Sequence, residues 1–362
     1  PVVVWNSTKT CNLKCRHCYM NSDAKKYQNE LTTEEARRFI DDLAEFRVPV
    51  LLFSGGEPLL RPDFFELAEH AAAKGVRPTL STNGTLIDRA TAQRIKDIGV
   101  GYVGISLDGL KDVNDKFRGK EGAYEAAMRG IENCTAVGQR VGLRFTINHH
   151  NIMELDKIFD FIEEEGINRV CFYHLVYSGR GNAMMEEDVT AEESRSAMDT
   201  IIRRTRDFEE RGLEKEILTV DNHCDGVYIY LKTLREKGEA AAEHVWKHIS
   251  MNGGNRSGIA FGEVDPLGYV HPDQFTQHHT FGNVRERKFG EIWQDTSNAI
   301  MAGLKDRKPL LTGRCSSCRY LSCCNGNFRT RAEARTGDFW ASDPSCYLTD
   351  EEIGLVGEEA AI

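Results

Sequence analysis

Short apolar runs alternate with helical patterns through the first half of this 362-residue chain. Such alternation implies a parallel sheet whose strands are joined by right-handed helical crossovers. Six units, rather than eight, predict an α/β fold built on an open, partial (β/α)6 barrel of the TIM-like type. The six predicted strands are Val2–Trp5, Val50–Phe53, Arg77–Ser81, Tyr102–Leu107, Gly142–Ile147 and Arg169–Tyr173.

Two local signals predict where helices begin and end. Thr32 is followed three residues later by Glu35, which is typical of a capping box at a helix start. Gly75 follows a helical pattern and predicts its end, because glycine adopts the left-handed conformation that closes many helices.

Polar motifs follow four of the predicted strands at their carboxyl ends. In barrels of this kind the loops at that end carry the chemistry, so we expect the four motifs to meet in one site. A plain turn is the alternative explanation for the third and the fourth motif. The motifs are the cysteine loop after Trp5, Ser54–Pro58 (SGGEP), Ser81–Gly84 (STNG) and Ser106–Gly109 (SLDG).

Cys11, Cys15 and Cys18 form a closely spaced triplet in the first of these loops. In a reducing compartment, cysteines clustered in this way hold metal more often than they form disulfides. Three thiolates can hold three irons of a [4Fe–4S] cluster and leave the fourth iron open for a small ligand. The alternative is a zinc loop with a fourth ligand elsewhere, for which His17 is a candidate.

The cysteine spacing, together with Gly55, Gly56 and Glu57, resembles the signature of the radical S-adenosylmethionine (SAM) enzymes. The resemblance implies that SAM binds the open iron and is cleaved reductively to a 5′-deoxyadenosyl radical, which abstracts a substrate hydrogen. It also implies a low-potential electron donor such as ferredoxin or flavodoxin. Glu57 is expected to accept hydrogen bonds from the SAM amino group, and the two glycines to let the backbone approach SAM closely. Residues expected to line the ribose and methionine side of the site are Ser81, Asn83, Ser106 and Asp108.

A second set of cysteines lies near the end of the chain, at Cys315, Cys318, Cys324 and Cys346. It resembles SPASM, a smaller α+β, twitch-like domain that holds auxiliary iron–sulfur clusters in many radical SAM enzymes; a structural zinc site is the alternative. The family's spacing favours Cys324 over its neighbour Cys323 as a ligand. Where a full SPASM motif has further cysteines, this chain has Asp273 and Phe328. We therefore expect one auxiliary cluster and two [4Fe–4S] clusters in all.

Changes of composition along the chain predict four segments. They are a radical SAM partial barrel (1–187), a helical bridge (188–250), a SPASM-like auxiliary-cluster domain (251–350) and an acidic tail (351–362). The net charge of -10 argues against a nucleic-acid partner. No apolar run approaches the roughly 18–20 residues of a membrane span, so we expect a cytoplasmic protein with no membrane partner.

Long strings in the second half resemble the tetrapyrrole-modifying branch of the radical SAM enzymes. The resemblance implies an iron tetrapyrrole substrate, and the reaction we expect is removal of acetates from 12,18-didecarboxysiroheme in the alternative haem pathway. One alternative is removal of propionates from the same substrate in haem d1 biosynthesis. A radical SAM peptide maturase and a non-catalytic iron–sulfur protein are two further possibilities. The strings include NGGNRSG, DPLGYVHPDQF, GNVRERKFGEIW and CFYHLVYSGRGNAM.

Histidine offers an axial ligand to such an iron, and arginine binds the carboxylates of such a macrocycle. We expect His174 and Arg180, at the end of the sixth strand, and His271 to contact the substrate. The remaining candidates are equally well explained by packing, by a polar turn or by exposure to solvent. They are His223, His278, His279, Arg256, Arg285, Arg287 and Arg329.

Overall fold

A nine-stranded sheet forms the centre of the protein, whose computed structural model describes residues 1–355. The strands are β1 (Val2–Thr8), β2 (Val50–Gly55), β3 (Arg77–Thr82), β4 (Val103–Ser106), β5 (Val141–Ile147), β6 (Arg169–His174), β7 (Glu216–Val220), β8 (Phe261–Val264) and β9 (Val270–His271). Their order is β7-β6-β5-β4-β3-β2-β1-β8-β9, and only the β8–β9 pair is antiparallel. The prediction of an open α/β fold with parallel strands is confirmed.

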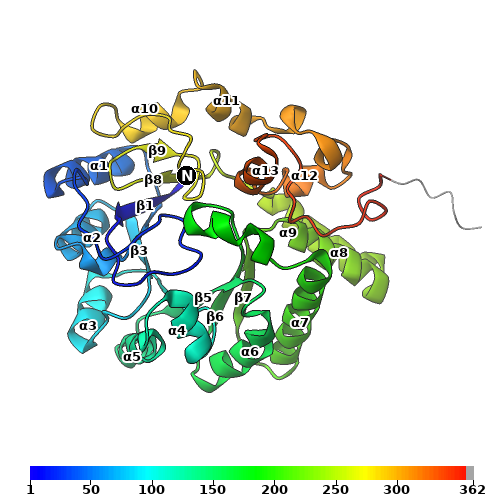
Figure 1. Cartoon of the computed structure of the whole chain (residues 1–362), viewed down its shortest axis with the longest axis horizontal. Helices are drawn as coiled ribbons and strands as arrows, with labels where there is room; N and C mark the ends of the chain where they lie inside the picture. Colours follow the sequence, from blue (N-terminus) through cyan, green and yellow to red (C-terminus); the bar gives the residue numbers. More distant parts are fainter. Residues whose placement is uncertain (356–362) are drawn as a thin grey trace, which may run out of the picture.

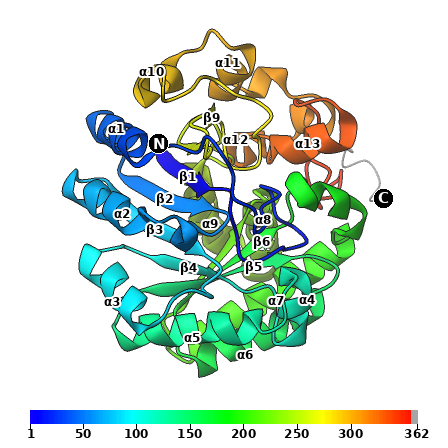
Figure 2. The same cartoon turned by 60° about the vertical axis from the view of Figure 1, so that its left-hand side comes forward.

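Helices lie around the outside of the curved sheet, and the segments after β9 lie along one side of it (Figures 1 and 2). The α-helices are α1 (Thr33–Glu45), α2 (Phe64–Ala73), α3 (Arg89–Ile98), α4 (Asp112–Arg118), α5 (Ala123–Ala136), α6 (Leu155–Glu164), α7 (Ala191–Glu210), α8 (Cys224–Lys237), α9 (Glu239–Asn252), α10 (Phe289–Gln294), α11 (Ala299–Lys305), α12 (Leu321–Cys324) and α13 (Arg329–Thr336). Short 3-10 helices are η1 (Pro58–Leu60), η2 (Ile152–Glu154), η3 (Gly179–Glu187), η4 (Lys308–Leu310) and η5 (Gly313–Ser317).

Both predicted helix signals are confirmed. The Thr32 hydroxyl accepts a hydrogen bond from the Glu35 amide, and the Glu35 carboxylate accepts one from the Thr32 amide, which is a complete capping box at the start of α1. Gly75 has a positive φ of 80° directly after α2, where a residue with a Cβ is strained.

Strand β7 lies in the segment 188–250, which the sequence was expected to fold as helix, so that prediction is wrong at these residues. The side chains of β7 (EILTV) are only half-buried because it is the edge strand beside β6, and it therefore lacks a fully apolar run. At the opposite side, β8 pairs in parallel with β1, with Val3 opposite Gly262. The boundaries of the four segments stay a prediction, and the acidic tail beyond residue 355 lies outside the described residues.

Aromatic packing fixes β1 and β2 against α1 and α2. The ring centroids of Trp5 and Phe39 are 5.7 Å apart, and those of Trp5 and Phe53 are 5.5 Å apart. Phe53 packs edge-on against Phe64 at 5.3 Å. Large aromatic side chains contribute most of the burial energy of a core, so these contacts hold the two strands whose ends carry the cysteine loop and the SGGEP motif.

The C-terminal part of the chain packs against the helices that follow β7. Tyr320 contacts both Tyr230 of α8 and Trp246 of α9, with centroid distances of 6.1 Å in each case. None of the helices within residues 1–355 combines the length and the apolar character that a membrane crossing needs.

Candidate active site

A cavity with about 1050 Å³ of empty space lies at the carboxyl ends of the parallel strands. Its wall comes from the ends of β2 to β6 and from the segment after β7, and Gln274 and Phe275 of the C-terminal part complete it. The predicted site residues on this wall are Cys11, Cys15, Cys18, Gly55, Gly56, Ser81, Asn83, Ser106, His174 and Arg180. The predicted residues that do not line it are Glu57, Asp108 and His271.

Hydrogen-bond donors surround the three cysteine sulfurs at the cavity. The amide of Leu13 donates to Sγ of Cys11 at 3.4 Å, and the amide of Ser22 donates to Sγ of Cys18 at 3.4 Å. Burial raises the pKa of Cys11 to about 12, so without a positively charged partner this sulfur keeps its proton. An iron centre supplies such a partner, because coordination removes the thiol proton.

The spacing of the sulfurs decides which metal group fits. Tetrahedral zinc, with Zn–S bonds of about 2.3 Å, holds its sulfurs about 3.8 Å apart. Among the described residues, no three cysteine sulfurs lie within 4.8 Å of one another. In a cubane cluster each cysteine binds a different iron, which requires wider spacing. At the triplet and at the C-terminal set, the sulfurs are therefore spaced more widely than a single zinc ion holds them, which favours a cluster.

Gly55 and Gly56 approach the backbone at the base of the cysteine loop. The Gly56 amide donates to the Thr8 carbonyl at 2.7 Å, and the Glu57 amide donates to the Thr10 carbonyl at 2.9 Å. A Cβ on Gly56 would lie 2.2 Å from the Thr10 oxygen, and one on Gly55 would lie 2.4 Å from the Thr8 oxygen. The two glycines therefore let the end of β2 pack closely against the backbone that leads into the cysteine loop. A close approach of the same glycines to SAM stays a prediction.

Glu57 is fully buried behind the cavity wall rather than on it. Its carboxylate accepts from the Leu59 amide at 3.1 Å, from the Thr82 hydroxyl at 2.8 Å and from the Asn83 amide at 2.9 Å. These three donors fill three of the roughly four acceptor positions of the carboxylate, so a hydrogen bond from the SAM amino group to Glu57 stays a prediction. Glu57 joins the end of β2 to the STNG turn, whose Asn83 amide group reaches Sγ of Cys11 at 3.9 Å.

Asp108 is also buried and pairs with Arg118, the last residue of α4. The Arg118 guanidinium in turn donates to Sγ of Cys15 at 3.6 Å, so Asp108 acts on the cavity through Arg118 rather than by lining it. His17, the candidate zinc ligand, stacks on Phe117 with ring centroids 4.8 Å apart. Burial lowers the pKa of His17 to about 4, which keeps the imidazole neutral.

Arg180 holds the cysteine loop in place. Its Nε donates to the Cys15 carbonyl at 2.7 Å and its Nη1 to the Ser22 carbonyl at 2.9 Å. Within the described residues, the buried Nη2 of Arg180 has no hydrogen-bond partner. This side chain therefore keeps one donor for a bound carboxylate at the cavity.

Of the two predicted histidines, His174 lines the cavity and His271 does not. Nε2 of His174 lies 3.0 Å from the Asp225 carboxylate, so this nitrogen is already engaged. Burial lowers the pKa of His174, but Asp225 more than offsets it and the pKa rises above its ordinary value. His271 is 1% exposed and faces Glu263 and Asp265, with its Nδ1 3.0 Å from the His279 carbonyl. The prediction that His271 contacts the substrate is wrong for this reason.

Arg144 and Asp221 are two of the cavity residues that were not predicted. Arg144 of β5 lies over the Tyr173 ring at 4.7 Å, an arrangement that leaves the N–H edges of the guanidinium for a ligand. An arginine inside the otherwise apolar run VGLRFTI was the signal for it. Asp221 directly follows β7, and burial raises its pKa to about 7. Because β7 itself was missed, no pattern pointed to Asp221.

A second cavity is lined by the C-terminal cysteines. Cys315, Cys318, Cys324 and Cys346 surround it, and so does Cys224 from the start of α8. The adjacent Cys323 is buried outside this cavity and its sulfur contacts the Tyr320 carbonyl at 3.2 Å. The four cysteines predicted from spacing thus converge, and the separation of Cys323 from Cys324 agrees with the choice made between them.

Cys224 was not predicted and lies against Cys346. Burial and then a hydrogen bond with Cys346 raise the pKa of Cys224, whereas the same hydrogen bond lowers the pKa of Cys346. The Cys224 thiol donates its proton to Oδ1 of Asn222 at 3.0 Å, so Cys224 lies beside Cys346 as a protonated thiol.

Asp273 and Phe328, which replace cysteines of a full SPASM motif, have structural roles. One carboxylate oxygen of Asp273 accepts from the amides of Phe275 and Thr276 and from the Thr276 hydroxyl, at 2.8–3.0 Å. Phe328 packs edge-on against Phe275 at 5.6 Å. Asp273 is thus committed to a turn, and an apolar ring occupies the second position.

Comparison with known proteins agrees with the fold and the two kinds of domain. Residues 5–162 match the Radical SAM superfamily, and residues 261–319 match the SPASM iron–sulfur cluster-binding domain. The structure titled native anSMEcpe with bound AdoMet superimposes with a TM-score of 0.74 at 19% identity, covering 98% of this chain and 96% of that chain. This last likeness shows the fold. The two matches together identify a radical SAM enzyme that carries a SPASM domain.

Two relatives narrow the class. The Fe-coproporphyrin III synthase of Methanosarcina barkeri is 58% identical, covering 98% of this chain and 89% of that protein. The pre-heme d1 synthase of Dinoroseobacter shibae is 43% identical, covering 98% of this chain and 88% of that protein. The chain belongs to the tetrapyrrole-modifying enzymes of the radical SAM superfamily. Its cofactors are SAM and two [4Fe–4S] clusters, and the hypothesis of a non-catalytic iron–sulfur protein is wrong.

Proposed function

We propose that this enzyme removes the two acetate side chains of 12,18-didecarboxysiroheme to leave methyl groups. The observation that carries the proposal is the full-length similarity to Fe-coproporphyrin III synthase, at 58% identity. Coproporphyrin III carries methyl and propionate groups, so an enzyme that makes its iron complex from this substrate must remove acetates and keep propionates. We also propose a low-potential electron donor such as ferredoxin or flavodoxin.

We propose that Cys11, Cys15 and Cys18 hold the cluster to which SAM binds. When bound, the cluster and SAM supply hydrogen abstraction by an organic radical. The chain's own residues orient that group: Arg118 and Arg180 fix the position of Cys15, and Gly55 and Gly56 seat the base of the loop. Ser81 and Ser106, on the wall at the ends of β3 and β4, are the polar groups we propose for the ribose and methionine side.

The cavity has the charge that an anionic macrocycle needs. Arg144 and Arg180 both line it and both keep N–H groups for carboxylates. Asp221, with a pKa raised by burial to about 7, can hold or release a proton at this wall.

The second candidate function is removal of propionates from the same substrate. The similarity to pre-heme d1 synthase, at 43% identity over 98% of this chain, favours it over the maturation of a peptide. The two candidates share the cavity, the clusters and the substrate, so only the product distinguishes them.

The function is tested by anaerobic incubation of the holoenzyme with SAM, a reductant and didecarboxysiroheme, followed by mass analysis of the tetrapyrrole. We expect loss of two acetate arms with all propionates retained. Loss of propionates with acetates intact would transfer the protein to the haem d1 route. Turnover of a peptide, with no binding of any siroheme derivative, would overturn the substrate class.

Arg144→Ala is the matching variant for this assay. Loss of a charge-assisted hydrogen bond costs about 1.5–3 kcal/mol, so we expect KM to rise by about 10- to 100-fold. Arg89→Ala, on the outer helix α3 and exposed, is the control and should leave KM unchanged. Both variants should retain about eight irons per chain, as two cubane clusters require.

We further propose that Cys315, Cys318, Cys324 and Cys346 hold the auxiliary cluster. When the cluster is bound, the Cys224 thiol turns from Oδ1 of Asn222, which lies 3.0 Å away, to donate to Cys346. Hydrogen bonds to the sulfurs raise the potential of such clusters, because they stabilise the more negative reduced state. A neutral hydrogen bond contributes about 0.5–1.5 kcal/mol. Cys224→Ala should therefore lower the auxiliary-cluster potential by about 20–60 mV, measured by redox titration with spectroscopic detection.

The iron content of the variants shows whether Cys224 only donates a hydrogen bond or is itself an iron ligand. Cys224→Ala should keep about eight irons per chain, whereas Cys346→Ala should lose about four. Cys323→Ala is the matched control, since its sulfur faces the Tyr320 carbonyl and should affect neither iron nor potential. If Cys224→Ala instead loses the auxiliary iron, Cys224 is a ligand and the assignment of Cys346 must change.

A further inference from the structure

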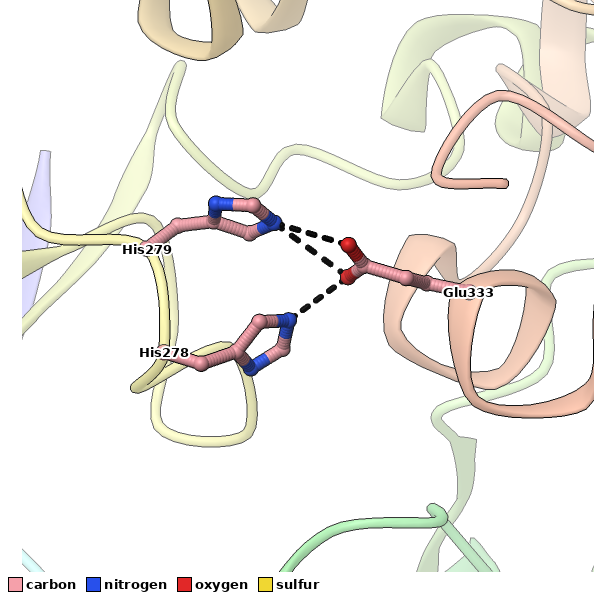
Figure 3. Close-up of side chains that lie close together, drawn as sticks. All are labelled: His278, His279 and Glu333. Carbon is pink, nitrogen blue, oxygen red and sulfur yellow. Dashed lines mark hydrogen bonds and ion pairs between the residues drawn. The ribbon is translucent and has the colours of Figure 1, made fainter. Parts of the chain in front are cut away.

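Three side chains outside both cavities bring their donor atoms together at the surface: His278, His279 and Glu333 (Figure 3). Nε2 of His278 lies 2.6 Å from the Glu333 carboxylate, and Nε2 of His279 lies 3.0 and 3.2 Å from its two oxygens. Among the residues that the structure describes, this is the only group of three such side chains whose donor atoms all lie within 4.8 Å of one another.

We propose that His278, His279 and Glu333 bind a divalent transition-metal ion. Two imidazole nitrogens and one carboxylate are donors that suit Zn²⁺ or Fe²⁺ better than Mg²⁺ or Ca²⁺, which prefer oxygen alone. His278 is exposed and the other two side chains are half-buried, so the remaining coordination positions face water.

The convergence of the two histidines is what distinguishes this group from ordinary ion pairs. The chain contains a second pair of consecutive histidines, His149 and His150. Those two diverge: Nδ1 of His149 lies 3.1 Å from Glu193, whereas His150 pairs with Glu187. At His278 and His279, by contrast, both Nε2 atoms face one carboxylate, as in Figure 3. A single cation can replace the hydrogen bonds there and bind all three groups at once.

The elements that carry these donors are held in place without a metal. Thr276 in the loop and Thr330 in α13 share a hydrogen bond of 2.7 Å between their hydroxyls. Helix α13 is anchored by Arg331, which forms a fully buried ion pair with Asp343 at 2.8 Å. The His279 ring packs edge-on against Phe339 at 5.1 Å. Binding therefore costs little reorganisation, which favours affinity.

The position of the site connects it to the active-site cavity. The loop that carries His278 and His279 also carries Gln274 and Phe275, which line that cavity. A cation that joins this loop to Glu333 stabilises the cavity wall against α13. Because such an ion binds the folded chain and not the unfolded one, it must also raise the melting temperature.

The test uses the holoenzyme with both clusters loaded, so that the ligand cysteines are occupied. The protein is equilibrated anaerobically with ZnCl2, freed of loose metal by gel filtration and analysed for zinc and for Tm. We expect the unmodified chain to retain one zinc ion more than Glu333→Gln and than His278→Ala/His279→Ala. We also expect zinc to raise the Tm of the unmodified chain more than the Tm of either of these variants. Glu333→Gln preserves the side-chain volume, so its Tm without zinc checks that it folds.

His150→Ala is the matched control, because it removes one of two consecutive histidines that face a carboxylate; it should retain the zinc. His244 and His248 on α9, with rings 4.5 Å apart, are also able to bind zinc, but they are the same in every variant and cancel in the comparison. Equal zinc in the unmodified chain and in Glu333→Gln would overturn the proposal. Loss of the zinc in His150→Ala would also overturn it.

Discussion

Replacing Cys15 by alanine is expected to abolish release of 5′-deoxyadenosine from SAM by the reduced holoenzyme. Cys15 lies between two arginines, with Arg118 on its sulfur and Arg180 on its carbonyl, and alanine at this position offers the cluster no ligand atom. Iron should fall from about eight to about four per chain, because the first cluster is lost and the auxiliary cluster stays. Chromatography of the nucleoside and elemental analysis measure the two quantities.

The control for this experiment is Cys134→Ala. Cys134 is fully buried in α5 and lines neither cavity, so this change should leave both the iron and the release of 5′-deoxyadenosine intact. If a variant with alanine at Cys11, Cys15 and Cys18 together still cleaves SAM, the assignment of the triplet is wrong. About twelve irons in the unmodified chain would mean three cubanes, and would contradict the assignment of Asp273 and Phe328 to structural roles.

Gly56→Ala is expected to remove the first cluster without touching a ligand. The added Cβ would lie 2.2 Å from the Thr10 carbonyl and 2.7 Å from that of Lys9, both of which are backbone atoms at the start of the cysteine loop. Overpacking of this kind costs about 1–3 kcal/mol or more, and relief of the clash must displace the loop directly before Cys11. We expect the iron content to fall by about four per chain and the denaturant midpoint of unfolding to decrease.

Gly101→Ala is the control for the steric argument. A Cβ there would lie 3.1 Å from Cδ of Arg77, which is part of a flexible side chain that can move aside. Neither glycine has a positive φ, so the two variants differ in the clash and not in backbone strain. If Gly56→Ala assembles both clusters and retains full activity, the close approach at the base of the loop is not required.

The parts of the fold that could be predicted are those with a strong local pattern. Strands β1 to β6 lie inside the sheet and are largely buried, so most of them read as apolar runs, as in VLLF at the start of β2. Strand β7 lies at an edge and reads as EILTV with half-exposed side chains, so it did not stand out. Strand β9 has two residues, too few to show any period.

The candidate site likewise contains residues that the sequence predicts and residues that it does not. Cysteine spacing indicates a metal site even when the fold is unknown. The N-terminal triplet lines one cavity and the C-terminal set lines another. Carboxylates carry no such signature. Glu57 and Asp108 were expected to line the SAM site. In the structure Glu57 accepts from the end of β3 and the turn after it, and Asp108 pairs with Arg118 of α4; no sequence pattern reveals these contacts. Cys224 was missed because it is separated by about ninety residues from the other auxiliary cysteines, and only the packing of α8 brings it to them.

The pairing of β8 with β1 has a consequence for biosynthesis. The ribosome completes the first strand and the cysteine loop long before it reaches residue 261, so one edge of β1 stays open while most of the barrel is made. An unpaired strand edge can pair with another chain and so promote aggregation. The free thiols beside it can bind metal ions other than the intended iron. The scaffold that delivers iron must therefore either wait for the last third of the chain or protect the nascent loop until β8 arrives. We therefore expect the first cluster to assemble stably only after β8 has paired with β1.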